Sequence, residues 1–175
     1  SKNIFELPLY IDETPAITIA AISNRSRRIK RLFGLELIVV DYIQLMRSSG
    51  SKDYNRVQEI SEITQGLKAL AKELDVPVLA LSQLSRAVEQ RDDKKPQLAD
   101  LRESGSIEQD ADVVMFIHRE DKHISEDDWI KLHPEHPYPL NIAEVIVAKH
   151  RHGPTGSFSM RFQERFARFE NMSNG

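Results

Sequence analysis

The chain has 175 residues, 40% of them hydrophobic, which is enough for a substantial core, so we expect residues 1–175 to form a single domain. Its formal net charge of −3 means that any contact with nucleic acid must come from local patches, and the absence of cysteine excludes disulfides and thiolate metal sites. No apolar run approaches the roughly 18 residues of a membrane span and the first residues lack the pattern of a signal peptide, so we expect a cytoplasmic protein without membrane contact.

The first elements are predicted from a short apolar run and a helix-capping pair. Residues 7–11 predict a short strand. Thr14 and Pro15 are typical of an N-cap and a first helical turn, so we predict a helix over residues 16–33 that stops at Gly34.

The next segments alternate between strand and helix patterns. Residues 35–40 are apolar at five of six positions, as in a strand covered on both faces of a parallel sheet. After a polar loop at 47–55, apolar side chains recur with the helical period over residues 56–74. Residues 78–81 predict a second buried strand. This alternation predicts an α/β fold with crossover units on a parallel sheet.

The second half contains two polar segments and three or more predicted strands. Residues 86–109 lose the apolar pattern, which predicts a charged, flexible loop. A strand is predicted at 113–118, followed by a polar surface insertion at 119–139. Residues 143–148 and 158–162 predict a hairpin, because the glycines and proline between them are turn residues, and a short strand or tail follows.

Two polar residues end predicted parallel strands. Asp41 follows the first strand and Gln83 the second, so both belong to the same edge of the sheet, where ligands bind in such folds. A carboxylate there commonly holds the Mg²⁺ that bridges phosphates, and an amide can both donate to and accept from a phosphoryl oxygen. The alternative is that both residues only terminate strands.

Two basic features are candidate phosphate contacts. Lys149 and Arg151 are two residues apart in extended backbone, so they share a face and could clamp a phosphate on another molecule. Arg102, Glu103 and Gly105 lie in a loop whose amides and arginine could follow a phosphate chain with little sequence preference. An exposed hairpin and a solvated loop are the alternatives.

The sequence contains no phosphate-binding loop of the G-x-x-x-x-G-K-[ST] type, although Asp41 would need one as a partner. Its six histidines do not have zinc-site spacing with other ligands.

Five segments in order resemble one family. They are LYIDETPAITI, LELIVVDYIQLM, LALSQLSRAVEQR, DLRESGSIEQDADVVMFIHRE and AEVIVAKHRHGPTGSFSMRF. They are similar to the C-terminal motor domain of DnaB-type replicative DNA helicases over nearly the whole chain, least so at 119–139. The resemblance implies a RecA-like α/β fold with flanking helices and a C-terminal antiparallel hairpin, incomplete at its N-terminal side. It also implies a hexameric ring that hydrolyses ATP with Mg²⁺ and moves along single-stranded DNA, and it makes primase and a helicase loader expected partners.

The resemblance assigns roles by motif. Asp41 resembles the Walker B acid, which holds Mg²⁺ usually through water, and Gln83 resembles the residue that senses the γ-phosphate. Lys149 and Arg151 resemble the pair that reaches the ATP of the neighbouring subunit, with Arg151 as the arginine finger. Arg102, Glu103 and Gly105 lie in the segment similar to the DNA loop of the central channel.

In the family, the phosphate-binding loop and the glutamate that activates water lie upstream of the first matching segment. We therefore expect a fragment that is inactive alone. Two alternatives remain. A related RecA-fold ATPase, of the recombinase or clock type, would share the fold and Asp41. A non-catalytic ring or interaction module would show no hydrolysis.

Overall fold

The computed structural model describes residues 7–48 and 55–172, apart from the side chains of residues 102–105. The chain forms two compact units, Ser1–Gln83 and Leu84–Gly175. That residues 1–175 act as one domain stays a prediction. Within the described segments, no helix is long and apolar enough to cross a membrane.

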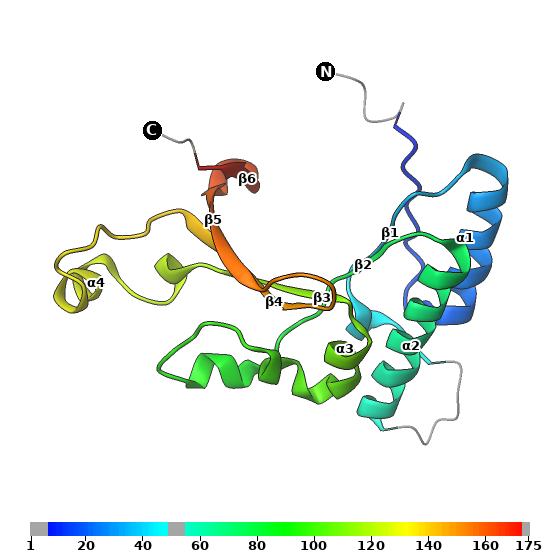
Figure 1. The fold of residues 1–175 in the computed structure, drawn as a ribbon, viewed down its shortest axis with the longest axis horizontal. Helices are drawn as coiled ribbons and strands as arrows, with labels where there is room; N and C mark the ends of the chain where they lie inside the picture. Colours follow the sequence, from blue (N-terminus) through cyan, green and yellow to red (C-terminus); the bar gives the residue numbers. More distant parts are fainter. Residues whose placement is uncertain (1–6, 49–54, 173–175) are drawn as a thin grey trace. The chain divides into compact units, whose positions relative to one another are not determined.

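The first unit places two helices beside a pair of parallel strands (Figure 1). Helices α1 (Ile19–Phe33) and α2 (Arg56–Leu74) pack against each other, and β1 (Ile38–Val40) pairs in parallel with β2 (Val78–Ala80). The crossover from β1 to β2 through α2 is the predicted parallel unit. The parallel pairing confirms that β1 and β2 end at the same edge.

Helix α2 occupies the predicted residues 56–74. Its buried side chains recur every three to four positions and form the core of this unit; they are Ile60, Ile63, Thr64, Leu67, Leu70 and Leu74. The helix begins with a capping box, in which Asn55 Oδ1 accepts from the Gln58 N–H and Gln58 Oε1 accepts from the Asn55 N–H. Asp75, in the left-handed conformation, ends it.

The cap of α2 supports a stability prediction. We expect Asn55→Ala to lower the free energy of unfolding by about 1 kcal/mol, because the amide of Gln58 loses its acceptor. Urea denaturation of this chain, followed by circular dichroism, measures the change. Asn55→Asp keeps an acceptor oxygen and is the control. Equal losses in the two variants would contradict the capping role.

Three predictions for the first unit are wrong. Residues 7–11 form no strand, and Leu9 and Ile11 are exposed instead of paired. Helix α1 begins at Ile19 because Ala16 has a positive φ of 51°, which is incompatible with a helix, and Thr18 provides the N-cap in place of Thr14.

Strand β1 differs from its prediction in length and in burial. It has three residues where 35–40 predicted six, and Val39 is 55% exposed. The strand is therefore covered on one face in this structure, whereas the apolar run predicted a strand covered on both faces.

The second unit is a four-stranded antiparallel sheet (Figure 1). Its strands follow one another in space as in sequence: β3 (Val113–His118), β4 (Ile142–His150), β5 (Gly156–Gln163) and β6 (Arg168–Asn171). The predicted strand, hairpin and final short strand are confirmed. A Cβ on Gly153 would lie 2.3 Å from a ring carbon of His150, so a larger residue there would require the exposed His150 side chain to move.

The loop predicted over residues 86–109 is wrong. This segment forms short helical turns: η3 (Arg86–Gln90), η4 (Leu98–Ser104) and α3 (Gly105–Asp110). Leu101 is buried with Val114 and Phe116 of β3, and the partly buried Leu98 and Ile107 pack against the same cluster. Apolar residues dispersed among charges thus pack the segment on the sheet, and polar contacts such as the Lys95–Glu144 ion pair add to them.

The insertion at 119–139 also has its own structure. It contains η5 (Glu120–Lys122) and α4 (Glu126–Leu132). The Tyr138 hydroxyl lies 3.0 Å from the Ile124 carbonyl and 3.2 Å from the Asp121 carbonyl, so its single proton is shared between them and ties the end of the insertion to its beginning.

A β-bulge interrupts the pairing of β3 with β4. Met115 pairs with Val147, but the neighbouring Val114 pairs with Lys149, so Ala148 is an extra residue in β4. Such a bulge re-aims the residues that follow it. Lys149 consequently lies on the same face of the sheet as the buried Val114.

Candidate nucleotide site and basic hairpin

Asp41 immediately follows β1 and is exposed. Among the described residues, its carboxylate has no hydrogen-bond or ion-pair partner. The peptide bond to Tyr42 is cis. An exposed carboxylate without an internal partner at the end of a parallel strand fits a hard cation, because Mg²⁺ is held by one or two carboxylates together with water and phosphate oxygens.

The ladder between the two strands continues beyond their ends. The Leu81 N–H donates to the Val40 carbonyl at 2.9 Å, and the Ile43 N–H donates to the Leu81 carbonyl at 3.0 Å. Residues Ile43–Leu45 then turn away as the short helix η2. The backbone of the first strand therefore cannot supply the next pair of bonds.

The side chain of Gln44 supplies them. Its Oε1 accepts from the Gln83 N–H at 3.2 Å, and its Nε2 donates to the Gln83 carbonyl at 3.2 Å and to Ser82 Oγ at 2.9 Å. The Gln44 amide thus makes the two main-chain hydrogen bonds to Gln83 that the next residue of a neighbouring strand would make. Gln83 is exposed, and its side chain has no hydrogen bond within the described segments.

A second set of contacts holds Gln44 from the side of α2. Arg56 donates to the Gln44 carbonyl at 2.7 Å and pairs with Glu59, which also accepts from the Ser48 N–H at 3.1 Å. Burial raises the pKa of Glu59, but the bonds from Ser48 and Arg56 outweigh burial and lower it. Glu59 therefore stays charged at neutral pH and keeps Arg56 in place.

Gln44 and Arg56 are functional candidates that the sequence patterns did not identify. Gln44 lies three residues after Asp41 within an apolar run, and nothing in the sequence indicates that its amide faces the second strand. An isolated polar residue just after a strand-ending acid was the available signal.

The basic hairpin consists of Lys149 and Arg151 at the end of β4 and in the turn that follows. Lys149 Nζ donates to the carbonyls of Glu108 and Gln109, and Arg151 donates to the Gln109 carbonyl at 3.3 Å. Arg151 also pairs with Asp112 at 3.3 Å. Both cations therefore share a face, as predicted, and lie at the C-terminal end of α3, where carbonyls favour positive charge.

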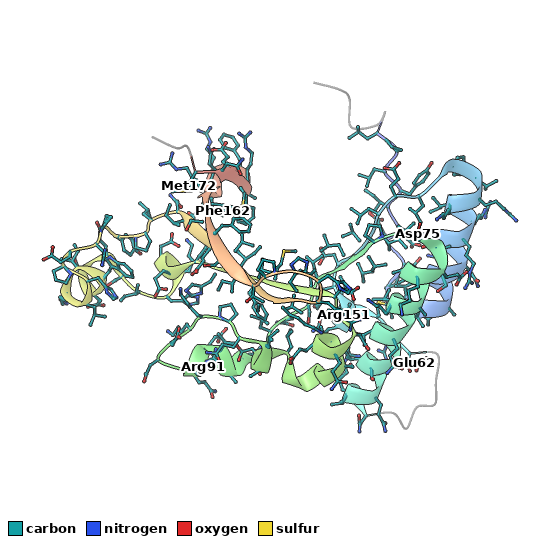
Figure 2. All side chains as sticks on the ribbon, in the orientation of Figure 1. Glu62, Asp75, Arg91, Arg151, Phe162 and Met172 are labelled. Atoms are coloured by element: carbon teal, nitrogen blue, oxygen red, sulfur yellow. The ribbon has the colours of Figure 1, made fainter. Side chains whose placement is uncertain are left out.

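Arg151 lies at the tip of the hairpin (Figure 2). Its side chain and that of Asp112 are 44% and 49% exposed. An exposed ion pair of this kind contributes roughly 0–1 kcal/mol, so the guanidinium can exchange it for a stronger anion at little cost.

The predicted DNA-contacting residues are described only in their backbone. Arg102 and Glu103 are in η4, and Gly105 begins α3. Their side chains lie outside the described part of the structure. Their role stays a prediction, whereas the helical segment that carries them is anchored to the sheet through Leu101 and Ile107.

The parallel strand pair, with a carboxylate and an amide at its carboxyl edge, is typical of α/β proteins that bind ligands at that edge of the sheet. Comparison with known families then assigns the chain. Residues 1–171 match the DnaB-like helicase C-terminal domain, and the chain belongs to this family.

The similar proteins are replicative helicases. The chain is 52% identical to the replicative DNA helicase DnaB of Rickettsia prowazekii, covering 98% of this chain and 37% of that protein. It is 50% identical to DnaB of Geobacillus stearothermophilus, covering 94% of this chain and 34% of the relative. The chain thus spans little more than a third of these relatives' length.

Two solved structures share the fold. One, described as an ATPase domain, is 42% identical with a TM-score of 0.78, covering 90% of this chain and 52% of that one. The other, a DnaB-like replicative helicase solved in a study of its interactions with primase, is 42% identical with a TM-score of 0.76, covering 90% and 35%. The predicted RecA-like α/β fold is confirmed.

Proposed function

We propose that this chain is part of the ATP-driven motor of a hexameric replicative DNA helicase, which translocates on single-stranded DNA and unwinds the duplex at the replication fork in the cytoplasm. The observation that carries the proposal is that the Asp41 carboxylate, without a partner among the described residues, and the exposed Gln83 follow two parallel strands at the same edge, in a chain of this family.

In this proposal the strand-end residues serve ATP and Mg²⁺. Asp41 would hold the ion, through water, and the Gln83 amide would contact the γ-phosphate. The bound ion would neutralise the phosphate charge that develops during transfer. Because the sequence contains no phosphate-binding loop of the G-x-x-x-x-G-K-[ST] type, another segment would cradle the phosphates in this proposal.

The basic hairpin would serve the neighbouring subunit. Arg151 offers planar, bidentate donors that suit phosphate oxygens, and Lys149 adds a point charge on the same face. Reaching across a subunit boundary makes each nucleotide site depend on two chains. A closed ring satisfies this requirement for all six subunits at once.

The partners follow from the same proposal. Arg102, Glu103 and Gly105 would contact the DNA backbone, which suits a motor that must not depend on sequence. Primase is a proposed partner because a similar helicase was solved in a study of its interactions with primase. A helicase loader is proposed on the family resemblance alone.

ATP hydrolysis by the full-length protein that carries this chain tests the function. We expect turnover that requires Mg²⁺ and rises when single-stranded DNA is added, together with unwinding of a forked duplex. Native mass spectrometry should show six subunits. Absence of hydrolysis in the unaltered protein would favour the non-catalytic module, and open filaments would favour a recombinase.

The DNA segment gives a separate prediction. We expect Arg102→Ala to weaken single-stranded DNA binding equally for different sequences and to reduce the salt slope of log K by about 0.7, because one phosphate contact is lost. Fluorescence anisotropy at several salt concentrations measures both.

Two variants serve as controls for that experiment. Arg102→Lys should retain most of the salt slope, and Lys131→Ala, in the exposed part of α4, should change nothing. A loss that depended on DNA sequence would contradict a backbone contact.

A further inference from the structure

We infer that Gln44 is a positioning residue for the nucleotide site: its side-chain amide sets the place of Gln83 relative to Asp41. The inference rests on the proposed roles of Asp41 and Gln83. Gln44 itself contacts neither a phosphate nor a metal in this assignment, and it acts through the main chain of Gln83.

The geometry of the contact supports a positioning role. One amide both accepts from the Gln83 N–H and donates to the Gln83 carbonyl, each at 3.2 Å. Two opposed hydrogen bonds on one residue restrict both its translation along the strand and its rotation about it. A third bond, to Ser82 Oγ at 2.9 Å, restrains the preceding residue.

The need for a side chain here follows from the path of the backbone. The backbone bonds between the strands stop at Ile43 and Leu81, because residues Ile43–Leu45 form η2. Gln83 lies beyond the last backbone hydrogen bond between the strands. Without the Gln44 side chain, its N–H would have no partner among the described residues. An exposed residue held only by the preceding strand would sample several positions, which is unsuitable for a group that contacts the γ-phosphate.

Gln44 is itself firmly held. The preceding Ile43 side chain is 1% exposed, and Arg56 binds the Gln44 carbonyl at 2.7 Å. Because only two residues separate Gln44 from Asp41, the same turn that carries the metal-binding carboxylate also carries the amide that holds Gln83. The turn from Asp41 to Gln44 therefore sets the spacing between the Asp41 carboxylate and Gln83.

The kinetic test uses ATP hydrolysis by the full-length protein. We expect Gln44→Ala to lower kcat by about 10²-fold, the loss typical of a misplaced group, with little change in KM for ATP. Gln44→Glu keeps the acceptor for the Gln83 N–H but cannot donate, and should fall between the wild type and Gln44→Ala. Gln65→Ala, an exposed glutamine on α2, is the matched control.

A double-mutant cycle separates positioning from a general structural effect. If Gln44 acts through Gln83, then Gln44→Ala combined with Gln83→Ala should be no slower than Gln83→Ala alone. Additive losses would overturn the inference, and so would unchanged kcat in Gln44→Ala and Gln44→Glu.

A physical readout on this chain is independent of activity. Amide hydrogen exchange at Gln83 should be faster in Gln44→Ala than in the wild type, and slower in Gln44→Glu, which keeps the acceptor for this N–H, than in Gln44→Ala, while the amides within α2 keep their protection. Unchanged exchange at Gln83 would overturn the inference. If the unaltered full-length protein did not hydrolyse ATP, the proposed function would fail, but this exchange result would still decide whether Gln44 holds Gln83.

Discussion

Arg151→Ala is expected to reduce kcat for DNA-stimulated ATP hydrolysis by about 10³-fold or more, while the dissociation constant for ATP stays nearly unchanged. The reason is that the guanidinium would stabilise charge only as the phosphoryl group is transferred, on the nucleotide of the neighbouring subunit. Its ion pair with Asp112 is exposed, so the substitution should not change the melting temperature appreciably. Steady-state turnover and binding of a fluorescent ATP analogue measure the two effects.

Mixed rings test whether Arg151 acts between subunits. A subunit with Arg151→Ala has an intact strand-end site, and a subunit with Asp41→Asn has an intact hairpin. Neither should be active alone, but mixing the two should restore part of the turnover, because a functional site can form at their boundary. Arg165→Ala, an exposed arginine elsewhere in the same unit, is the control. Unchanged turnover in Arg151→Ala would remove the finger assignment.

Asp41→Asn is expected to lower kcat by about 10²-fold or more, since metal stabilisation of several kcal/mol corresponds to tenfold per roughly 1.4 kcal/mol. Asparagine keeps the size of the side chain and removes its charge. The Mg²⁺ concentration for half-maximal activity should rise in the same variant. Titration of activity with Mg²⁺ at constant ATP measures both.

The stability of Asp41→Asn distinguishes a ligand from a strand-terminating residue. Because the carboxylate is exposed and has no partner among the described residues, its replacement should leave the melting temperature unchanged. Glu36→Gln, an acid just before β1, is the matched control for loss of one charge. A lower melting temperature with an unchanged Mg²⁺ requirement would support the strand-terminating alternative.

The sequence predicted elements whose signals are local. Helix α2 was found with its correct bounds because apolar side chains recur with the helical period directly after a polar loop. The β4–β5 hairpin was found because glycine and proline mark its turn. The alternation of strand and helix patterns predicted parallel pairing, which located Asp41 and Gln83 at one edge.

The start of α1 was missed for a local reason, the positive φ of Ala16, but other failures arose because distant partners decided the structure. Residues 86–109 looked like a loop because only a few apolar residues are spread among charges, yet those few are buried against β3. Residues 7–11 looked like a strand but have no strand to pair with among the described residues. The contact of Gln44 with Gln83 spans 39 positions and left no periodic pattern.

The bulge in β4 has a consequence for which side chains can serve the hairpin's chemistry. Side chains in a strand alternate between faces, so a shift of one residue exchanges them. If β4 paired regularly, Ala148 would lie opposite Val114, and His150 would be on the face of α3 in place of Lys149 and Arg151. Ala148 carries no functional group, yet this one extra residue decides that Lys149 and Arg151, and not His150, are presented there.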